Sequence, residues 1–477
     1  MSARPTLHQL ADHYDLVVIG GGITGAGVLR EAMRTGAKVL LVEQGDYASG
    51  TSSRSSKLVH GGLRYLKIGQ WRLTLESVRE RERLLREAPD LVLPLPFLMP
   101  LHRGRKPGRW LMQVGLSIYD LMAGSRKSRF LDADEVLARA PGVVREGLFG
   151  GLAFEDAITD DARLVLRLIF DSTALGAMAM NYTQAQVIEP GRLRLVDRID
   201  GGAREIGAAM VVNATGAWQD ATPGAPALRP LRGSHFIFPA RKWPLQGAVS
   251  WLHPRDARPI FALPWLGAVV FGTTDLDHAG AIDAPRMTPD EAAYLLEGLD
   301  AEFPALKLRA SDAIATYAGV RPVVAHGEAA PSAESRESAI WSRPQSVSVT
   351  GGKLTTFHLT AREVLREAAE QVPRLAPAED GPLFGAPMQV AGERIAETPF
   401  TWEGVLHALR QEHVVHLVDL MLRRTRLGLI VERGGVELLP RIGELFKQEL
   451  GWNDARWAQE QHDYLNDWQR QHAPVTA

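Results

Sequence analysis

The sequence contains no cysteine among its 477 residues. This absence excludes disulfides, thiolate zinc sites, iron–sulfur clusters and cysteine nucleophiles. Redox chemistry would therefore depend on an organic cofactor, or on a metal held by histidines and carboxylates. Net charge is also small, at −2 from 54 Lys and Arg against 56 Asp and Glu. A balance so close to zero argues against nucleic acid as a partner.

Long hydrophobic runs are lacking as well. No window reaches the roughly 18 consecutive apolar residues that span a bilayer, and the longest candidate, residues 110–122, is interrupted by Gln113 and Asp120. Residues 1–12 are polar and mixed, without the apolar stretch of a secretory signal. We therefore expect a cytoplasmic protein. The composition, 45% hydrophobic and 23% charged, is that of a folded chain, and its length predicts two or three domains.

A βαβ unit opens the chain. Residues 14–19 form an apolar, β-branched run typical of a buried strand, a helix-compatible stretch follows, and residues 38–43 predict a second strand. Between the first strand and the helix stands the fingerprint Gly20-x-Gly22-x-x-Gly25. Such glycines let the backbone approach a pyrophosphate at the helix N-terminus, and Glu43 is placed to accept hydrogen bonds from ribose hydroxyls. The unit predicts a bound dinucleotide, and both NAD and FAD fit it.

Motifs further along the chain carry a family resemblance. The main ones are a Ser- and Gly-rich run at 49–66, Val-Val-Asn-Ala-Thr-Gly-Ala-Trp at 211–218 and Gly-Gly-Lys-Leu-Thr-Thr at 351–356, with shorter matches at 160–164, 233–235, 272–275 and 319–322. In this order, over residues 14–360, the sequence resembles the FAD-dependent glycerol-3-phosphate dehydrogenases of the D-amino-acid-oxidase-like flavoproteins. The resemblance implies FAD as the cofactor. Residues 417–429 are similar to the helical C-terminal domain of that family, which looks shortened here.

The resemblance implies a fold class and a domain division. We expect an α/β FAD-binding, Rossmann-like domain, an inserted α+β substrate cap with an antiparallel sheet, and a C-terminal all-α domain. The FAD-binding domain is assigned to 10–80, 151–233 and 312–375, the cap to 81–150 and 234–311, a linker to 376–400 and the helical domain to 401–477.

The motifs also indicate the residues that hold FAD. Small hydroxyl side chains can donate to a diphosphate, glycines let backbone lie close to the flavin ring, and a cation near the N1–C2 carbonyl region stabilises the reduced flavin. The predicted cofactor residues are Gly20, Gly22, Ile23, Thr24, Gly25, Glu43, Thr51, Ser52, Ser56, Lys57, His60, Gly61, Gly62, Val187, Gly216, Trp218, Gly352, Lys353 and Leu354.

The substrate implied by the resemblance is glycerol 3-phosphate, and a phosphate calls for cations in the site. The predicted substrate residues are Arg64, Tyr65, Thr273, Thr274, Arg321 and Lys353. Oxidation of an alcohol needs a base with a pKa near the working pH, which favours histidine. His235 and His60 both lie in matching motifs. We favour His235, whose strand should line the substrate side, with His60 positioning the flavin, and we place Arg64 and Arg321 beside His235 in the catalytic set.

Residues 103–129 are a candidate membrane contact, which bears on the electron acceptor. Seven basic residues and one acidic residue flank an apolar stretch that contains Trp110. This pattern suits an interfacial segment on anionic lipid, and equally a buried cap helix with solvated basic ends. The resemblance implies a peripheral enzyme on the inner face of the plasma membrane that reduces membrane quinone, and it is compatible with a homodimer.

Four other readings compete. They are a glycerol-3-phosphate oxidase that reduces O2 to H2O2, a related D-amino-acid-oxidase-like flavoenzyme, a flavin-binding protein without turnover, and an NAD-dependent dehydrogenase. The long extra insertion of the oxidase branch is not seen between Asp275 and Arg321. The flavin-type motifs downstream disfavour NAD.

Overall fold

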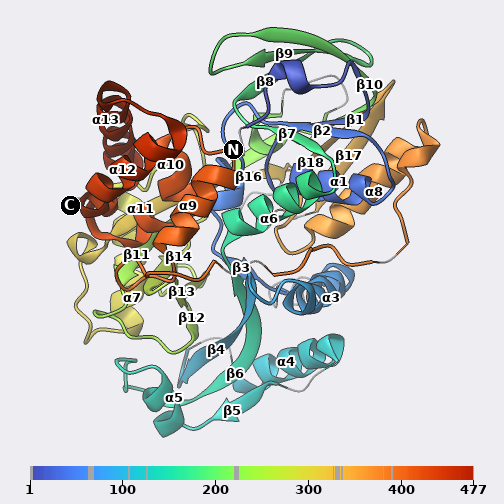
Figure 1. The fold of residues 1–477 in the computed structure, drawn as a ribbon. Coiled ribbons are helices and arrows are strands. Elements are labelled where there is room, and N and C mark those ends of the chain that lie inside the picture. The colour runs from blue at the N-terminus through green and yellow to red at the C-terminus, as the bar shows by residue number, and fades with distance from the viewer. Residues whose placement is uncertain are drawn as a thin grey trace.

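The computed structural model describes residues 4–62, 69–105, 108–124, 127–219, 225–325, 337–379, 381–387 and 390–475, together with Gly327 and Glu334. Two large sheets and a group of C-terminal helices make up the molecule (Figure 1). None of the helices in these ranges combines the length and the apolar character needed to cross a membrane.

The first sheet, which we call sheet A, has the strand order β17-β18-β10-β1-β2-β7, and β9 and β8 extend it from β10. Strands β18, β10, β1, β2 and β7 run parallel, whereas β17, β9 and β8 pair antiparallel. The strands are β1 (His13–Ile19), β2 (Val39–Val42), β7 (Met178–Met180), β8 (Thr183–Glu189), β9 (Arg192–Asp197), β10 (Ala203–Asn213), β17 (Ser338–Arg343) and β18 (Ser346–Gly351). The predicted opening unit, β1, α1 (Ile23–Met33) and β2, is confirmed.

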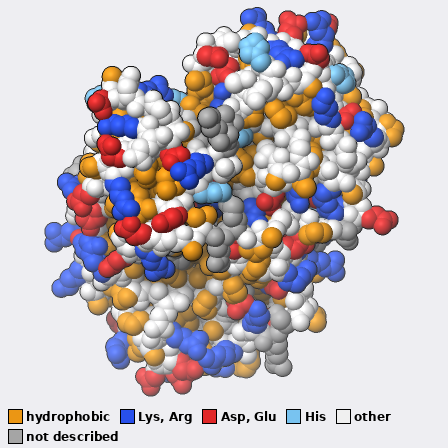
Figure 2. All heavy atoms as spheres, in the orientation of Figure 1, with side chains coloured by type: hydrophobic (Ala, Val, Ile, Leu, Met, Phe, Trp, Pro, Cys, Tyr) orange, Lys and Arg blue, Asp and Glu red, His pale blue; other side chains and the backbone are white. Residues whose placement is uncertain are grey.

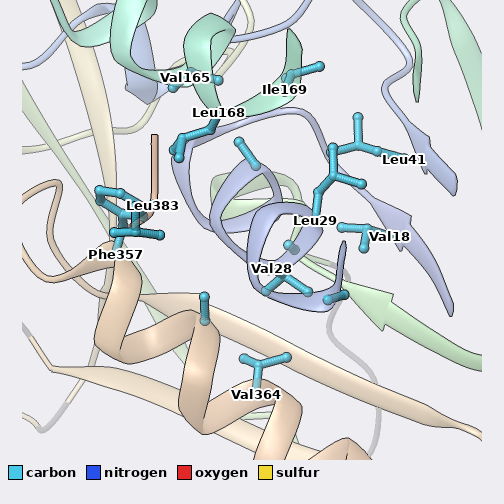
Figure 3. Packing of buried hydrophobic residues seen from close by; sticks show 14 of the residues in the cluster. Val18, Val28, Leu29, Leu41, Val165, Leu168, Ile169, Phe357, Val364 and Leu383 are labelled. Atoms are coloured by element: carbon cyan, nitrogen blue, oxygen red, sulfur yellow. The ribbon is translucent and has the colours of Figure 1, made fainter. Parts of the chain in front are cut away.

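Helices α1, α6 (Asp161–Ala174) and α8 (Phe357–Ala369) pack side by side on sheet A. Their apolar side chains meet those of the strands in one core, where Val28 and Leu29 lie close to Val18 and Leu41 (Figure 3). Gly27 of α1 allows the close approach of α8, because a Cβ atom there would lie 2.8 Å from the ring of Phe357. This packing fixes the position of the α1 N-terminus at the carboxyl edge of the sheet.

The second sheet, sheet B, has the order β15-β11-β14-β13-β12-β4-β6-β3, with β16 beside β11 and β5 beside β6. Its pairs are antiparallel, except that β4 and β12 run parallel. The strands are β3 (Leu58–Val59), β4 (Val92–His102), β5 (Arg129–Leu131), β6 (Leu148–Thr159), β11 (Leu228–Pro239), β12 (Ala248–Leu252), β13 (Pro259–Trp265), β14 (Ala268–Gly272), β15 (Leu276–Asp277) and β16 (Ala315–Val324).

Sheet B departs from the predicted domain division at three strands. We assigned β3, most of β6, and β16 to the FAD-binding domain, but β3 pairs with β6, β6 with β4, and β16 with β11 in sheet B. No change of composition marks these boundaries. Within residues 376–400, expected as a linker, Leu383 is fully buried and belongs to the core.

The remaining helices cover the two sheets. Helices α3 (Trp71–Glu87), α4 (Arg109–Ala123), α5 (Ala133–Arg139) and α7 (Pro289–Glu302) accompany sheet B. The C-terminal group consists of α9 (Trp402–Gln411), α10 (Leu417–Asp419), α11 (Leu427–Ile430), α12 (Leu439–Leu450) and α13 (Asp454–Gln471). Figure 2 shows basic and acidic side chains mixed over these C-terminal helices, and a notch between them and the part of sheet A that carries β8 and β9.

The segment 417–429, which is similar to a helical C-terminal domain, does not form one continuous α-helix. Between α10 and α11 the chain makes a wider π-helical turn, Leu420–Arg424. This turn carries Arg423 and Arg424 into buried ion pairs with Asp46, which follows β2. Insertion of these guanidinium groups between two parts of the molecule accounts for the departure from regular α-helix.

Candidate active site

The glycine fingerprint forms a cradle at the carboxyl edge of sheet A. Gly20 has φ +115°, and a Cβ atom there would lie 2.5 Å from the carbonyl oxygen of Ala214 in the neighbouring strand connection. A Cβ atom on Gly25 would lie 1.9 Å from the carbonyl oxygen of Gly20. Only glycine fits at either position, so the loop is held tightly against the first turn of α1. The N–H groups of that turn then point to the space above the sheet edge, as an anion site requires.

Glu43 closes the cradle from the end of β2. Its carboxylate accepts hydrogen bonds from the backbone N–H of Gly21, at 2.7 Å, and from that of Gly45, at 2.8 Å. Burial raises the pKa of Glu43, while these N–H groups oppose the rise. Each oxygen keeps a second lone pair for a ligand hydroxyl, and Glu43 lines the cavity described below. The position is therefore suited to the ribose role predicted for it.

The hydroxyl-rich loop after β2 fastens the cradle to sheet B. Ser52 Oγ accepts the backbone N–H of Ile23 at 2.9 Å, at the first turn of α1. Thr51 Oγ1 donates to the carbonyl of Val320 on β16, at 2.5 Å. On the other side of the edge, Trp218 stacks its ring on Gly50, where a Cβ atom would lie 2.7 Å from the indole. The loop thus bridges the two sheets at the point where they face one another.

One large cavity, of about 2740 Å³, extends from this cradle to sheet B. Ordinary small-molecule sites occupy about 300–1,000 Å³, so this cavity has room for a dinucleotide and a small substrate together. The predicted residues that line it are Gly20, Gly22, Ile23, Thr24, Glu43, Thr51, Ser52, Ser56, His60, Gly62, Val187, Gly216, Trp218, Thr273, Arg321, Gly352, Lys353 and Leu354. The cradle without Cβ atoms, the helix N-terminus and the buried acid all fit FAD.

Sheet B contributes the cationic wall opposite the cradle. Arg321 of β16 donates from Nη1 to Asp275 Oδ1 at 3.0 Å and from Nη2 to Thr273 Oγ1 at 3.3 Å. These contacts hold the planar guanidinium in place, and its side chain stays 27% exposed. Lys353, after β18, lines the same cavity. The arrangement can bind an anionic group such as a phosphate.

His235 is close to the cationic wall, but its side chain is buried and does not line the cavity. The residue is on β11, and its side chain is buried against Tyr317, with ring centroids 4.6 Å apart and planes 9° apart. Its Nε2 is 2.9 Å from Ser56 Oγ. Burial holds the pKa of His235 well below its ordinary value, and the charges of Arg321 and Lys57 lower it further. The imidazole is therefore neutral at physiological pH and can accept a proton.

Four more predicted residues do not line the cavity. Gly25 supports the loop from below. The Lys57 ammonium is fully buried and pairs with both carboxylate oxygens of Asp161, at 2.9 Å. Gly61 packs on α3 and α4, because a Cβ atom there would lie 2.4 Å from Val78 and 2.5 Å from the Tyr119 hydroxyl. The Thr274 hydroxyl turns away and donates to Glu291 Oε1 at 2.8 Å.

Two predicted substrate residues, Arg64 and Tyr65, lie outside the described residues. Other residues of the cavity wall were missed. Arg54 lies in the hydroxyl-rich loop and donates to Gln471 Oε1 of α13 at 3.1 Å. Burial lowers its pKa to about 10, and its place between predicted serines was a usable signal. The missed apolar residues, such as Phe97, Leu111 and Phe154, come from elements distant in sequence and share no local pattern.

Comparison with known proteins agrees with this geometry. Residues 15–365 match the model of the FAD dependent oxidoreductase family, and residues 361–457 match the C-terminal domain of alpha-glycerophosphate oxidase. Proteins of Staphylococcus aureus strains USA300 and MRSA252, named aerobic glycerol-3-phosphate dehydrogenase, are 37% identical over 370 residues. The match covers 74% of this chain and 66% of theirs, so the chain spans just under two thirds of the length of these relatives.

Solved structures show the same fold. The glycerol-3-phosphate dehydrogenase of Bacillus halodurans, complexed with FAD, has a TM-score of 0.75 and 25% identity over 98% of this chain and 97% of that one. The L-alpha-glycerophosphate oxidase of Mycoplasma pneumoniae, with FAD bound, has a TM-score of 0.60 and 17% identity over 80% of this chain and 100% of that one. The chain therefore belongs to the family of FAD-dependent oxidoreductases, with FAD as its cofactor.

Proposed function

We propose that this protein oxidises sn-glycerol 3-phosphate to dihydroxyacetone phosphate and passes the electrons to a membrane quinone. The observation that carries the proposal is the single cavity that joins the dinucleotide cradle of sheet A to the cationic wall of sheet B. The names of the similar proteins from S. aureus and B. halodurans support the same substrate.

Each part of the cavity has a task in this reaction. Bound FAD supplies a two-electron acceptor for the hydrogen on C2 of the substrate. Arg321, held by Asp275 and Thr273, presents its planar fork to the phosphate. Lys353 adds a second positive charge to the same cavity. Arg64 and Tyr65 remain predicted substrate residues. The buried, neutral His235 takes up the hydroxyl proton.

Substitution of Arg321 tests the substrate assignment. Arg321→Lys keeps the charge but loses the fork, and we expect the KM for glycerol 3-phosphate to rise by about tenfold to a hundredfold, as loss of one to two charge-assisted hydrogen bonds implies. FAD content should not change. Arg433→Gln, at an arginine whose side chain is 70% exposed, is the control and should leave KM unaltered. Equal activity of the unaltered enzyme on glycine or other amino acids would favour the related flavoenzyme reading instead.

Helix α4 supports the quinone as acceptor. Three of its residues, Leu111, Val114 and Ile118, border the cavity beside Phe97 and Phe154 of sheet B, and of these Leu111 and Val114 are also 72% and 58% exposed. The cavity therefore extends from the cradle into an apolar region under this helix. An apolar, partly aromatic wall is the lining that a lipid-soluble quinone requires.

The outer side of α4 supports a membrane location. Trp110, Leu111 and Leu121 are 74%, 72% and 81% exposed. Arg105, Lys127 and Arg129, near the two ends of the helix, are also well exposed. Lys106 and Arg126, counted among the basic residues of this segment, lie outside the described residues. An exposed apolar helix flanked by basic residues favours the interfacial interpretation over the buried cap helix, and supports a location on an anionic inner membrane face.

The acceptor is tested by two parallel assays on the purified holoenzyme with glycerol 3-phosphate. We expect rapid reduction of a short-chain quinone analogue and little H2O2 in air. Stoichiometric H2O2 with slow reduction of the quinone analogue would overturn the quinone assignment, and the enzyme would then be a glycerol-3-phosphate oxidase.

A further inference from the structure

His235 cannot reach the cavity with its own ring. One face of the imidazole is covered by Tyr317. Near its edge lies Gly272 of β14, where a Cβ atom would come within 2.6 Å of His235 Cδ2. The side chain is buried and does not form part of the cavity wall. A substrate bound beside Arg321 would therefore not touch His235 directly.

Ser56 connects His235 to the cavity. Its hydroxyl oxygen is 2.9 Å from His235 Nε2, and the residue belongs to the cavity wall. In the described part of the chain, the other ring nitrogen, Nδ1, is buried and has no hydrogen-bond partner. Ser56 is thus the polar contact through which a proton can pass between the imidazole and the cavity.

The charges around His235 keep the resting imidazole neutral. Tyr317 and Arg321 face it from β16, and Lys57 lies 4.7 Å from the Tyr317 ring. Lys57 is paired with Asp161 of α6, which is itself paired with Arg426 from the C-terminal helices. His472, at the end of α13, approaches from the same side through a 3.0 Å contact between its Nδ1 and the carbonyl of Thr316. The nearby cations disfavour a positive charge on the resting imidazole, so its Nε2 lone pair is free to receive the serine proton.

We propose that Ser56 and His235 form a two-residue proton relay, in which Ser56 Oγ takes the proton of the substrate hydroxyl while the Ser56 proton passes to His235 Nε2. The inference rests on the proposed function. The substrate O–H bond and the serine O–H bond break, and a new O–H bond on Ser56 and an N–H bond on Nε2 form. The hydrogen on C2 leaves with its electron pair to the flavin. The relay requires the tautomer of His235 that carries its proton on Nδ1.

The test compares Ser56→Ala, Ser56→Thr and His235→Asn in the FAD-loaded enzyme. We expect Ser56→Ala and His235→Asn each to lower kcat by about a hundredfold to ten-thousandfold, the usual contribution of a general base. The double variant should be no worse than either single variant, because the two residues act as one unit. Ser56→Thr keeps a hydroxyl and should recover most of the loss. Ser53→Ala is the matched control, since its hydroxyl faces Gly50 and not the cavity.

Two further readouts separate a relay from a structural role. We expect kcat of the unaltered enzyme, plotted against the D2O fraction of the solvent, to give a curve, because two protons are transferred together. The same plot for Ser56→Ala should be a straight line. The decline of kcat at acid pH, from protonation of His235, should disappear in His235→Asn. FAD absorbance and circular dichroism check that each variant folds.

Each outcome has a distinct meaning. If Ser56→Ala keeps kcat within twofold of the unaltered enzyme, or if the double variant multiplies the two single losses, the relay is wrong while the proposed function stands. If the unaltered holoenzyme is not reduced by glycerol 3-phosphate at all, the proposed function fails, and the relay fails with it.

Discussion

The interface of the C-terminal helices and the surface of helix α4 differ in what they bury and what they expose. Where the C-terminal helices meet the FAD-binding part, charge is buried: Asp46, fully buried, binds both Arg423 and Arg424, and Arg426 binds Asp160 and Asp161 at 2.7 and 2.6 Å. Helix α4 does the reverse, because Trp110 and Leu121 extend into solvent, 74% and 81% exposed.

The difference indicates which of the two surfaces already has its binding partner within the chain. The ion pairs satisfy one another within a single chain, so the C-terminal interface needs no other partner. The apolar side chains on the exposed face of α4 stay in contact with water in the isolated chain. An exposed apolar surface of this kind usually binds a protein, a membrane or a ligand. Mutations in the C-terminal interface should therefore change the free energy of unfolding, and mutations on the exposed face of α4 should change binding to lipid.

The largest effect is expected at Asp46. Asp46→Asn leaves two buried guanidinium groups without their carboxylate, and loss of one partner of a buried pair costs about 3–5 kcal/mol. Chemical denaturation of the holoprotein measures this loss. Glu437→Gln is the control, since the Arg433–Glu437 pair has side chains 70% and 77% exposed and should contribute less than about 1 kcal/mol. Similar effects of both variants would contradict the comparison.

The pH dependence of stability should also trace to this interface. Burial, followed by the charge of Arg424, lowers the pKa of His413 to about 4, against about 6.5 in an unfolded chain. Below pH 6.5 the unfolded chain binds a proton that the folded chain does not, so stability falls as the pH is lowered from 6.5 toward 4. The slope from this residue is about 1.4 kcal/mol per pH unit.

His413→Gln should remove that slope, measured as the free energy of unfolding at several pH values. His358 is the matched comparison, because its carboxylate partners Glu31 and Glu80 raise its pKa. Its contribution is present below pH 6.5 and is lost as the pH rises through its folded-state pKa. An unchanged slope in His413→Gln would show that the histidine is charged in the folded protein.

The smallest effect on folding and the clearest effect on binding are expected at α4. Trp110→Ser together with Leu121→Ser should leave unfolding within about 0.5 kcal/mol, as for other surface substitutions. Binding to vesicles that contain anionic lipid should fall at least tenfold, because burial of each side chain contributes about 1.5–3 kcal/mol. Sedimentation with vesicles measures it. Ile188→Ser and Ile199→Ser, at apolar residues 48% and 47% exposed and far from α4 in sequence, provide the matched control.

The sequence predicted the parts of the fold that depend on local patterns. Strand β1, the glycine turn, helix α1 and strand β2 are of this kind, because a few neighbouring residues carry the hydrophobic pattern and the boundaries of each. Most of the predicted site residues line the cavity, because they belong to motifs whose order is distinctive.

The parts that were not predicted depend on contacts between distant residues. Arg423 and Arg424 lie in the segment that is similar to a helical C-terminal domain, and nothing near them in sequence indicates Asp46 as their partner. Lys57 was predicted as a cofactor residue because of its motif, and nothing in that motif indicates that its ammonium pairs with Asp161, more than a hundred positions away. The crossing of β6 and β16 into sheet B is of the same kind. One sequence carries no signal of such pairings.

The most direct test of the account is anaerobic addition of glycerol 3-phosphate to the purified holoenzyme while the absorbance of its flavin is followed. The account predicts rapid bleaching by glycerol 3-phosphate, and none by glycerol or by amino acids at the same concentration. Bleaching by an amino acid, or no bleaching by glycerol 3-phosphate in protein that holds FAD, would contradict it.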